Sequence, residues 1–319
     1  MGGGASGLND GFISHDNIEY ICYHHEQSAG HAAIGESKYT GNIAVVNPTT
    51  GCGGTNCVTS VLNAWQDSVP VIFVSGNVKL MDCTHRINEE NWTSIRKYGV
   101  QEHDIIQTVC SITKYAHFVQ DAADIPRIFE EAIYQATTGR PGPVWIDIPS
   151  DIQVAKMPEL YAHYTLPAAP SGLDKNDFRR IKRRIEKSNR PIVLAGYGIR
   201  QSNTVAEFVN FIETYELPFV STYGARDYVP YDHPLNIGAI GIKGSRSGNF
   251  ALQNADLLLV LGSSLGASVV GYDPSMFSPA SFKIVVDVDI EERDKPNLIG
   301  IDEYYIENLS RFFLGMNDE

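Results

Sequence analysis

The sequence has no apolar run that approaches the ~20 residues needed to span a bilayer, and its first residues lack the basic and apolar regions of a secretory signal peptide. Positive charge is scarce as well, because 38 acidic residues outnumber 25 lysines and arginines and give a formal net charge of −13. This charge repels a phosphate backbone, which argues against non-specific nucleic-acid binding. We therefore expect a cytoplasmic protein with neither membrane nor nucleic-acid partners.

Cysteine is sparse, and its five positions predict neither a disulfide framework nor a zinc site. Cys52 and Cys57 lie five positions apart, whereas the cysteines of a zinc or redox pair lie about three apart. The polar segment 24–31 also fails as a zinc-protease motif, because Ala29 stands where the second histidine is required. No metal ligands are predicted within the chain.

Short segments that are apolar throughout and rich in valine and isoleucine alternate with segments of helical periodicity. Continuous apolarity over such lengths is typical of strands buried on both faces, as in parallel sheets. We expect strands at 43–46, 69–74, 143–148, 191–195, 218–220, 256–261 and 283–288, and helices at 55–67, 125–137, 174–187 and 204–215. This alternation predicts an α/β fold of doubly wound parallel sheets with right-handed crossovers.

A proline-rich segment divides the chain. Pro158, Pro167 and Pro170 fall in a stretch with few helix or strand signals, which is typical of a linker over the surface. We predict a first domain at residues 1–160, a linker at 161–174 and a second domain at 175–319. Each domain is long enough to enclose its own core.

Glu26 is the first candidate functional residue. It follows a strand-like segment at 18–23 and precedes a run of small residues, which let a helix pack closely. A carboxylate at the end of a strand can share a proton with a ligand nitrogen. The alternative is a surface glutamate at a helix N-terminus, where the helix dipole favours negative charge. The local pattern alone favours this second interpretation.

Glycine-rich turns follow two of the predicted strands. The turn at 47–56 lets backbone N–H groups approach a ligand, although it is neither a P-loop nor a dinucleotide fingerprint. A plain turn, with Thr55 or Asn56 as the helix N-cap, explains it equally well. The turn at 195–198 has two glycines of a dinucleotide fingerprint but lacks the third.

Read together, these segments resemble the thiamine-diphosphate (ThDP) enzymes of the acetolactate synthase and pyruvate decarboxylase superfamily. The resemblance covers nearly the whole chain, in order, through residues 24–41, 45–76, 99–116, 137–152, 188–199, 232–245, 254–266 and 284–292. It implies a pyrimidine-binding domain followed by a Rossmann-like central domain.

The resemblance also implies a third domain, which binds the diphosphate and Mg²⁺ through a Gly-Asp-Gly…Asn motif. This motif does not occur in the 319 residues. We therefore expect the diphosphate-binding domain to be absent from this chain and to come from a missing C-terminal part or from a partner chain. The first helix and strand of the pyrimidine-binding domain are likewise expected to be missing.

The resemblance assigns catalytic roles in the first domain. Glu26 matches the glutamate that hydrogen-bonds N1′ of the aminopyrimidine and so helps the cofactor lose its thiazolium proton before a 2-oxo acid is attacked and CO₂ leaves. Gln101 matches the glutamine that faces the thiazolium, and the backbone at Gly3 resembles a loop that binds a developing oxyanion. The segment that embraces the pyrimidine ring matches Thr50, Gly51, Cys52 and Asn56.

Departures from the family pattern bear on the reaction. Cys52 and Ser150 stand where acetolactate synthases usually have proline and lysine. His103 stands alone where pyruvate decarboxylases have paired histidines, which favours a carboligase over a simple decarboxylase. The long segment 77–100 resembles ThDP enzymes found with polysaccharide-sugar biosynthesis, some of which transfer a two-carbon unit from pyruvate to a ketosugar.

The central domain resembles relatives that bind FAD. The matching positions of this domain are Gly196, Gly198, Thr222, Gly241 and Gly244, and Arg140 of the first domain matches an arginine that contacts FAD. Asp287 ends a later strand, where a carboxylate can hold a ribose hydroxyl or cap the next turn. The arginine-rich segment of FAD-binding relatives is replaced by 264–268, so FAD, an ADP-type ligand and an empty fold remain open alternatives.

We predict a ThDP-dependent carboligase that decarboxylates a 2-oxo acid, with pyruvate as the first candidate. The alternative is a regulatory nucleotide-binding subunit that has kept the fold. The presence of both Glu26 and Gln101 favours the enzyme. Because the cofactor of this family lies between two subunits, we expect a homodimer or homotetramer, or a complex with a partner chain that carries the diphosphate-binding domain.

Overall fold

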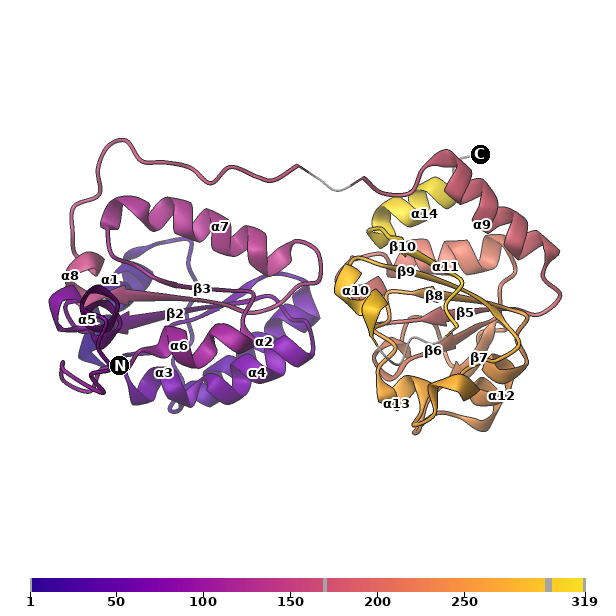
Figure 1. Ribbon diagram of the computed structural model, residues 1–319, viewed down its shortest axis with the longest axis horizontal. Helices are drawn as coiled ribbons and strands as arrows, with labels where there is room; N and C mark the ends of the chain where they lie inside the picture. The colour runs from indigo at the N-terminus through magenta and orange to yellow at the C-terminus, as the bar shows by residue number, and fades with distance from the viewer. Residues whose placement is uncertain (1, 169–170, 296–299, 318–319) are drawn as a thin grey trace. The chain divides into compact units, whose positions relative to one another are not determined.

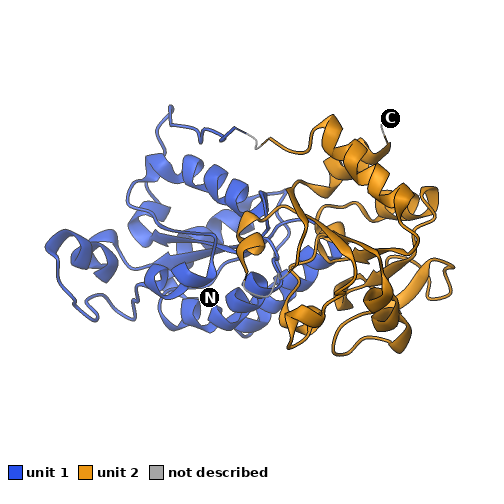
Figure 2. Ribbon diagram, turned by 45° about the vertical axis from the view of Figure 1, so that its right-hand side comes forward, with its two compact units in different colours: residues 1–168 blue, residues 169–319 orange. Residues whose placement is uncertain are grey.

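The computed structural model describes residues 2–168, 171–295 and 300–317. The chain divides into two compact units, Met1–Ala168 and Ala169–Glu319, which are coloured separately in Figure 2. Pro170 of the predicted linker lies outside the described residues. In the described part of the chain, no helix has the length and apolarity that crossing a membrane requires.

The first unit contains a four-stranded parallel sheet with the order β1-β2-β4-β3. Figure 1 labels β2 and β3 of this sheet. Its strands are β1 (Ala44–Val46), β2 (Val71–Asn77), β3 (Tyr115–Phe118) and β4 (Val144–Pro149). The central strands β2 and β4 are buried along their whole length, as continuous apolar sequence predicts.

Helices cover both faces of this sheet. On one face, Val61 packs in a core with Phe73 and Trp145. On the other, Ile128 packs with Ile146. The helices are α1 (Ser6–Ser14), α2 (Glu26–Thr40), α3 (Cys52–Asn56), α4 (Val58–Gln66), α5 (Thr84–Asn91), α6 (Ile105–Val109), α7 (Ile125–Thr137) and α8 (Ser150–Gln153), with 3-10 turns at Gly3–Ala5, Leu80–Asp82, Cys110–Ile112 and Ala122–Asp124.

The second unit contains a six-stranded parallel sheet with the order β10-β9-β8-β5-β6-β7. Counted from the first strand of the unit, this is the 3-2-1-4-5-6 order of a Rossmann fold, with its switch point between β5 and β8. The strands are β5 (Pro191–Ala195), β6 (Phe219–Ser221), β7 (Asn236–Ala239), β8 (Leu257–Leu261), β9 (Phe282–Asp287) and β10 (Glu303–Ile306).

Two cores again lie on opposite faces of the sheet. Successive residues of β8 alternate between them, so that Leu259 belongs to one core and Leu258 to the other. The helices of this unit are α9 (Lys175–Lys187), α10 (Gly198–Gln201), α11 (Val205–Thr214), α12 (Arg246–Asn254), α13 (Ala267–Val270) and α14 (Leu309–Asn317), with 3-10 turns at Tyr223–Ala225, Pro274–Met276 and Ile290–Asp294.

The sequence-based prediction of two doubly wound parallel α/β sheets is confirmed. The strand-like segment at 18–23 does not form a strand: it has no regular structure, and Ile21 is 77% exposed. Most of the helix expected at 55–67 is present as α4, but a separate short helix, α3, precedes it. The helical segment begins at Cys52 after Gly51, and it tightens where the N–H of Cys57 donates to the carbonyl of Gly54, three residues back.

Candidate active site

A cluster of predicted site residues lies at the carboxyl ends of β1 and β2, where the loops of a parallel α/β sheet form ligand sites. The loop after β1 carries Thr49 and Thr50 and leads into α3. The N-terminal glycine turn lies against this loop, because a Cβ atom at Gly4 would be 3.0 Å from the Cβ of Thr50. On its other side, the carbonyl of Gly4 lies against the backbone of Gly76 at the end of β2.

Glu26 is the first residue of α2 and is half-buried. The helix is capped by the neighbouring His25, whose Nδ1 accepts from the N–H of Gln27 at 3.2 Å. The Glu26 side chain turns toward the glycine loop, where Asn56 Nδ2 donates to Oε2 at 2.9 Å. A Cβ atom at Gly53 would be 3.3 Å from Oε1, so the absence of a side chain there leaves that oxygen accessible.

The second oxygen of this carboxylate is available to a ligand. Within the described residues, Oε1 of Glu26 accepts no hydrogen bond, whereas Oε2 is held by Asn56. Burial and the charge of Glu26 raise the pKa of the Cys57 thiol to about 12, so this thiol stays neutral and donates to the Glu26 carbonyl at 3.7 Å. A carboxylate held on one side and open on the other fits the ring nitrogen of an aminopyrimidine.

The loop that carries Gln101 joins the same cluster. The carbonyl of Gln101 lies directly against Gly51, and the Gln101 side chain is exposed. The next residue, Glu102, is buried and fixes the loop: its carboxylate accepts from Thr84 Oγ1 at 2.9 Å and from the N–H of Tyr98 at 3.0 Å. These hydrogen bonds connect the segment between β2 and Gln101 to Glu102.

Gln153 was not identified from the sequence, although it holds the N-terminal glycine turn. Its side-chain amide nitrogen, Nε2, donates to the carbonyls of Gly4 and Ile148, both at 2.7 Å. Its Oε1 accepts from the N–H of Gly7 at 3.1 Å. One amide side chain therefore connects the turn around Gly3 to the end of β4, and only the fold brings these segments together.

The structure brings together the predicted residues Gly3, Glu26, Thr50, Gly51, Cys52, Asn56 and Gln101 through these loops, with Cys52 exposed at the start of α3. It does not bring Arg140 to them. Arg140 Nε donates to Ser68 Oγ at 2.7 Å, between the segments that lead into β4 and β2. Arg140 therefore lies at the amino ends of these strands, opposite the Glu26 cluster.

In the second unit, glycines meet at the switch point of the sheet. The N–H groups of Gly196 and Gly198 donate to the carbonyls of Leu261 and Gly262, both at 2.9 Å. A Cβ atom at Gly198 would be 2.8 Å from the Cα of Gly262. These glycines allow two turns to pack backbone against backbone, and Thr222 is joined to them through its N–H bond to the Ala195 carbonyl.

The other predicted residues of the second unit lie on neighbouring loops. Gly241 has a φ of +95°, and its N–H and carbonyl both bond the Asn249 side chain, at 2.9 and 3.1 Å. Gly244 closes the same turn by donating to the Gly241 carbonyl. Asp287 is buried at the end of β9, where it accepts from the N–H of Asp289 at 3.1 Å.

A pocket of about 220 Å³ opens beside the Gly241 turn. It is lined by Gly241, Ile242, Asn249, Leu252, Gln253, Val269, Val270, Gly271 and Phe277. This lining contains no charged side chain, so it fits an apolar or aromatic part of a ligand better than a diphosphate.

The chain combines a carboxylate and glycine loop at the end of one parallel sheet with a second sheet of Rossmann order. Residues 1–107 match the family described as thiamine pyrophosphate enzyme, N-terminal TPP binding domain. Residues 178–301 match thiamine pyrophosphate enzyme, central domain. The chain therefore belongs to the thiamine pyrophosphate enzyme family, thiamine pyrophosphate being another name for ThDP.

Acetolactate synthases are among the relatives to which this chain is most similar. It is 35% identical over 297 residues to the acetolactate synthase large subunit of Lactococcus lactis, and 32% identical over 295 residues to the isozyme 1 large subunit of Escherichia coli. Each alignment covers 92% of this chain, but 49% and 50% of the respective relatives. The chain thus spans about half the length of these relatives.

Proposed function

We propose that this chain supplies the pyrimidine-binding part of a ThDP-dependent active site, and that the working protein is an acetolactate synthase-like carboligase. It would decarboxylate a 2-oxo acid, with pyruvate as the first candidate, and join the remaining fragment to an acceptor. The observation that carries this proposal is the Glu26 carboxylate, which is held by Asn56 through Oε2 and has Oε1 open beside Gly53.

Bound ThDP supplies a carbon nucleophile and an electron sink for the decarboxylation of 2-oxo acids. In the proposal, Glu26 holds a proton between its Oε1 and a ring nitrogen of the aminopyrimidine. Asn56 fixes the orientation of the carboxylate, and Gly53 allows the ring to approach. Gln101 and the backbone at Gly3 are proposed to contact the substrate side, where an N–H group can stabilise developing negative charge.

The diphosphate and Mg²⁺ are proposed to bind a domain outside these residues, on the same protein or on a partner chain. We also propose a homodimer or homotetramer, in which the two parts of the active site come from different subunits. We place the protein in the cytoplasm, and its five free cysteines support a reducing compartment.

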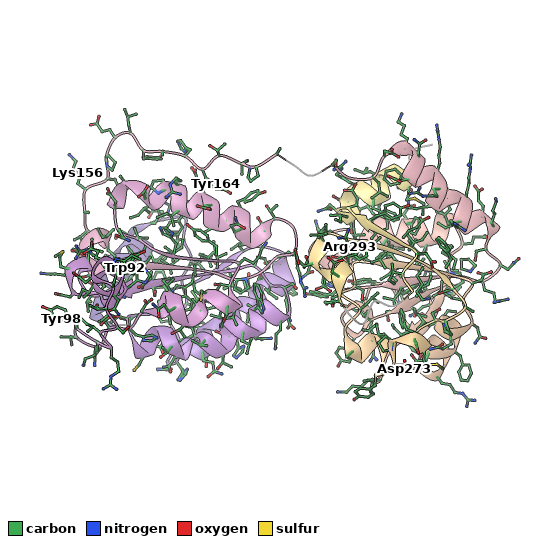
Figure 3. The ribbon with its side chains drawn as sticks, in the orientation of Figure 1. Trp92, Tyr98, Lys156, Tyr164, Asp273 and Arg293 are labelled. Carbon is green, nitrogen blue, oxygen red and sulfur yellow. The ribbon has the colours of Figure 1, made fainter. Side chains whose placement is uncertain are left out.

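The segment between β2 and Gln101 is the proposed determinant of the acceptor, for which we propose a ketosugar. It contains α5 and a long loop in which Trp92 and Tyr98 are 95% and 64% exposed, and Figure 3 labels both at the end of the first unit that holds α5. Aromatic side chains with exposed faces are suited to pack against sugar rings.

For the central domain, the proposed ligand is FAD or another ADP-containing molecule. The Rossmann strand order and the glycine turns at Gly196 and Gly198 support this proposal. Backbone packing against Gly262 explains the same glycines without a ligand, so absorbance of flavin released from the purified protein distinguishes the two.

The proposed function is tested by CO₂ release from pyruvate by the full-length protein with ThDP and Mg²⁺. Replacing Glu26 with Gln is expected to lower the rate by about 10²–10⁴-fold, the range of general acid–base catalysis. Glu36→Gln, at an exposed position of the same helix, is the matched control and should retain the rate.

Equal rates for the wild type and Glu26→Gln would contradict the role of this carboxylate. If the wild type releases no CO₂ from any 2-oxo acid and shows no thermal shift with ThDP, the regulatory-subunit alternative replaces the carboligase. The presence of both Glu26 and Gln101 in this chain favours the enzyme over that alternative.

A further inference from the structure

A carboxylate is buried in the middle of the first sheet. Asp147 lies on β4 and is 1% exposed. Within the described residues it has no ion-pair partner, and such a group is costly unless hydrogen bonds replace its water. It accepts two: Ser75 Oγ donates to Oδ1 at 2.5 Å, and Asn77 Nδ2 donates to Oδ2 at 2.7 Å.

One of these bonds leads out of the core to the candidate active site. Asn77 is the last residue of β2 and is 2% exposed. Its Oδ1 accepts from the N–H of Val78 and from Thr50 Oγ1, both at 2.8 Å. Because a backbone N–H can only donate and an ionised carboxylate can only accept, the orientation of the Asn77 amide is fixed from both ends. The Thr50 hydroxyl must then donate its proton inward.

Thr50 is the point at which the loops of the site meet. It precedes Gly51, which lies against the Gln101 carbonyl. It also lies close to Gly4, because a Cβ atom at Gly4 would be 3.0 Å from the Cβ of Thr50. The neighbouring Thr49 packs against Gly53, beside the carboxylate of Glu26. Fixing the Thr50 side chain therefore fixes the spacing of three loops.

We infer that Asp147 is a positioning residue that acts through Asn77 on Thr50, and thereby sets the spacing of the glycine loop against Glu26 and the Gln101 loop. This inference rests on the proposed function, because it makes a residue outside the ligand site a determinant of ThDP affinity. Asp147 itself does not contact the cofactor in this inference.

The other bond of the same carboxylate provides a matched control. Ser75 Oγ, which donates to Asp147, accepts from Trp145 Nε1 at 2.8 Å, so this branch runs into the core and touches none of the three loops. Ser75→Ala removes a buried hydrogen bond of Asp147 without breaking the connection through Asn77. It reports the general cost of disturbing the carboxylate.

The first experiment measures ThDP affinity of the full-length protein with Mg²⁺ by calorimetry. Asp147→Asn is expected to weaken ThDP binding by about tenfold or more, since the hydrogen bond from Asn77 loses its charged acceptor, whereas Ser75→Ala should change it by less than about twofold. In the background of Thr50→Val, which lacks the hydroxyl, Asp147→Asn should have little further effect, because both changes act on the same connection through Asn77.

The second experiment needs no cofactor. Amide hydrogen exchange in residues 49–54 of the unliganded protein should become faster in Asp147→Asn but not in Ser75→Ala. If Asp147→Asn does not fold, Asn77→Ala removes the connection while the Ser75 bond remains, and the same results are expected of it.

Equal effects of Asp147→Asn and Ser75→Ala, or additive effects of Asp147→Asn and Thr50→Val, would overturn the inference. Failure of the wild type to bind ThDP would overturn the proposed function instead. In that case hydrogen exchange still decides whether Asp147 holds the loop.

Discussion

The backbone of Gly51 lies against the carbonyl oxygen of Gln101, so close that a Cβ atom at position 51 would overlap that oxygen. Both residues have a left-handed backbone, with φ of +60° at Gly51 and +58° at Gln101. For Gln101 this conformation is unfavourable unless the surrounding structure holds it. The buried Glu102 provides such an anchor, since it binds Thr84 and the N–H of Tyr98.

Replacing Gly51 with alanine should destabilise the protein by roughly 2–3 kcal/mol, because the new side chain has a strained φ and meets backbone that cannot move aside. The measurement is urea denaturation of the full-length protein. We also expect weaker ThDP binding, since the Gln101 loop must shift away from the glycine loop. An unchanged denaturation midpoint would show that the two loops can separate freely.

Gly3→Ala is expected to behave in the opposite way. A Cβ atom at Gly3 meets no atom within 4 Å, so the free energy of unfolding should change by less than about 0.5 kcal/mol. If the backbone at Gly3 faces the substrate, the added methyl group should nevertheless lower the rate of CO₂ release. Loss of stability without loss of rate would place the role of Gly3 in the fold.

Asn56→Ala should lower ThDP-dependent activity about tenfold or more, because the Glu26 carboxylate loses the hydrogen bond that orients it. Asn56 is exposed, so stability should change little. Asn63→Ala is a suitable control: this amide lies on α4 and donates to the exposed Asp67 at 3.2 Å. A similar loss of activity in both variants would mean that the effect does not pass through Glu26.

The fold prediction is most accurate for strands that are buried on both faces. The strands that were expected lie mostly inside the sheets, where both faces are covered and the sequence is continuously apolar. The three strands that were missed, β3, β7 and β10, are each at the edge of a sheet and are half-exposed, with polar residues among the apolar ones. Segment 18–23 has the opposite character, since its apolar side chains suit a strand but stay exposed.

For the site, the sequence predicts which loops matter but not how they are held. The glycines after β1 are visible in the sequence as a turn, and Glu26 stands out among small residues. The connection from Asp147 through Asn77 to Thr50 joins three separate segments and depends on the strand pairing of β2 with β4. The one available signal was an aspartate within an otherwise apolar strand, which is rare without a specific partner.

The titration of Asp147 gives a further prediction. Burial raises its pKa from 3.8 to about 6, hydrogen bonds from Ser75 and Asn77 oppose this shift, and the nearby charges of Asp104 and His85 raise and lower it. The folded protein therefore binds this proton more tightly than the unfolded chain, so the contribution of Asp147 to stability is present below pH 4 and is lost as the pH rises to about 6. The change is on the order of 3 kcal/mol.

Urea denaturation between pH 4 and 7 measures this contribution. The wild-type free energy of unfolding should carry a component that falls across the window from about pH 4 to 6, and Asp147→Asn, which cannot titrate, should lack that component. Subtracting the two curves removes the titration of the other carboxylates, which both proteins share. If the difference between the two free energies of unfolding does not change with pH, Asp147 has the same pKa in the folded and unfolded chain. Water then reaches this carboxylate in the folded protein.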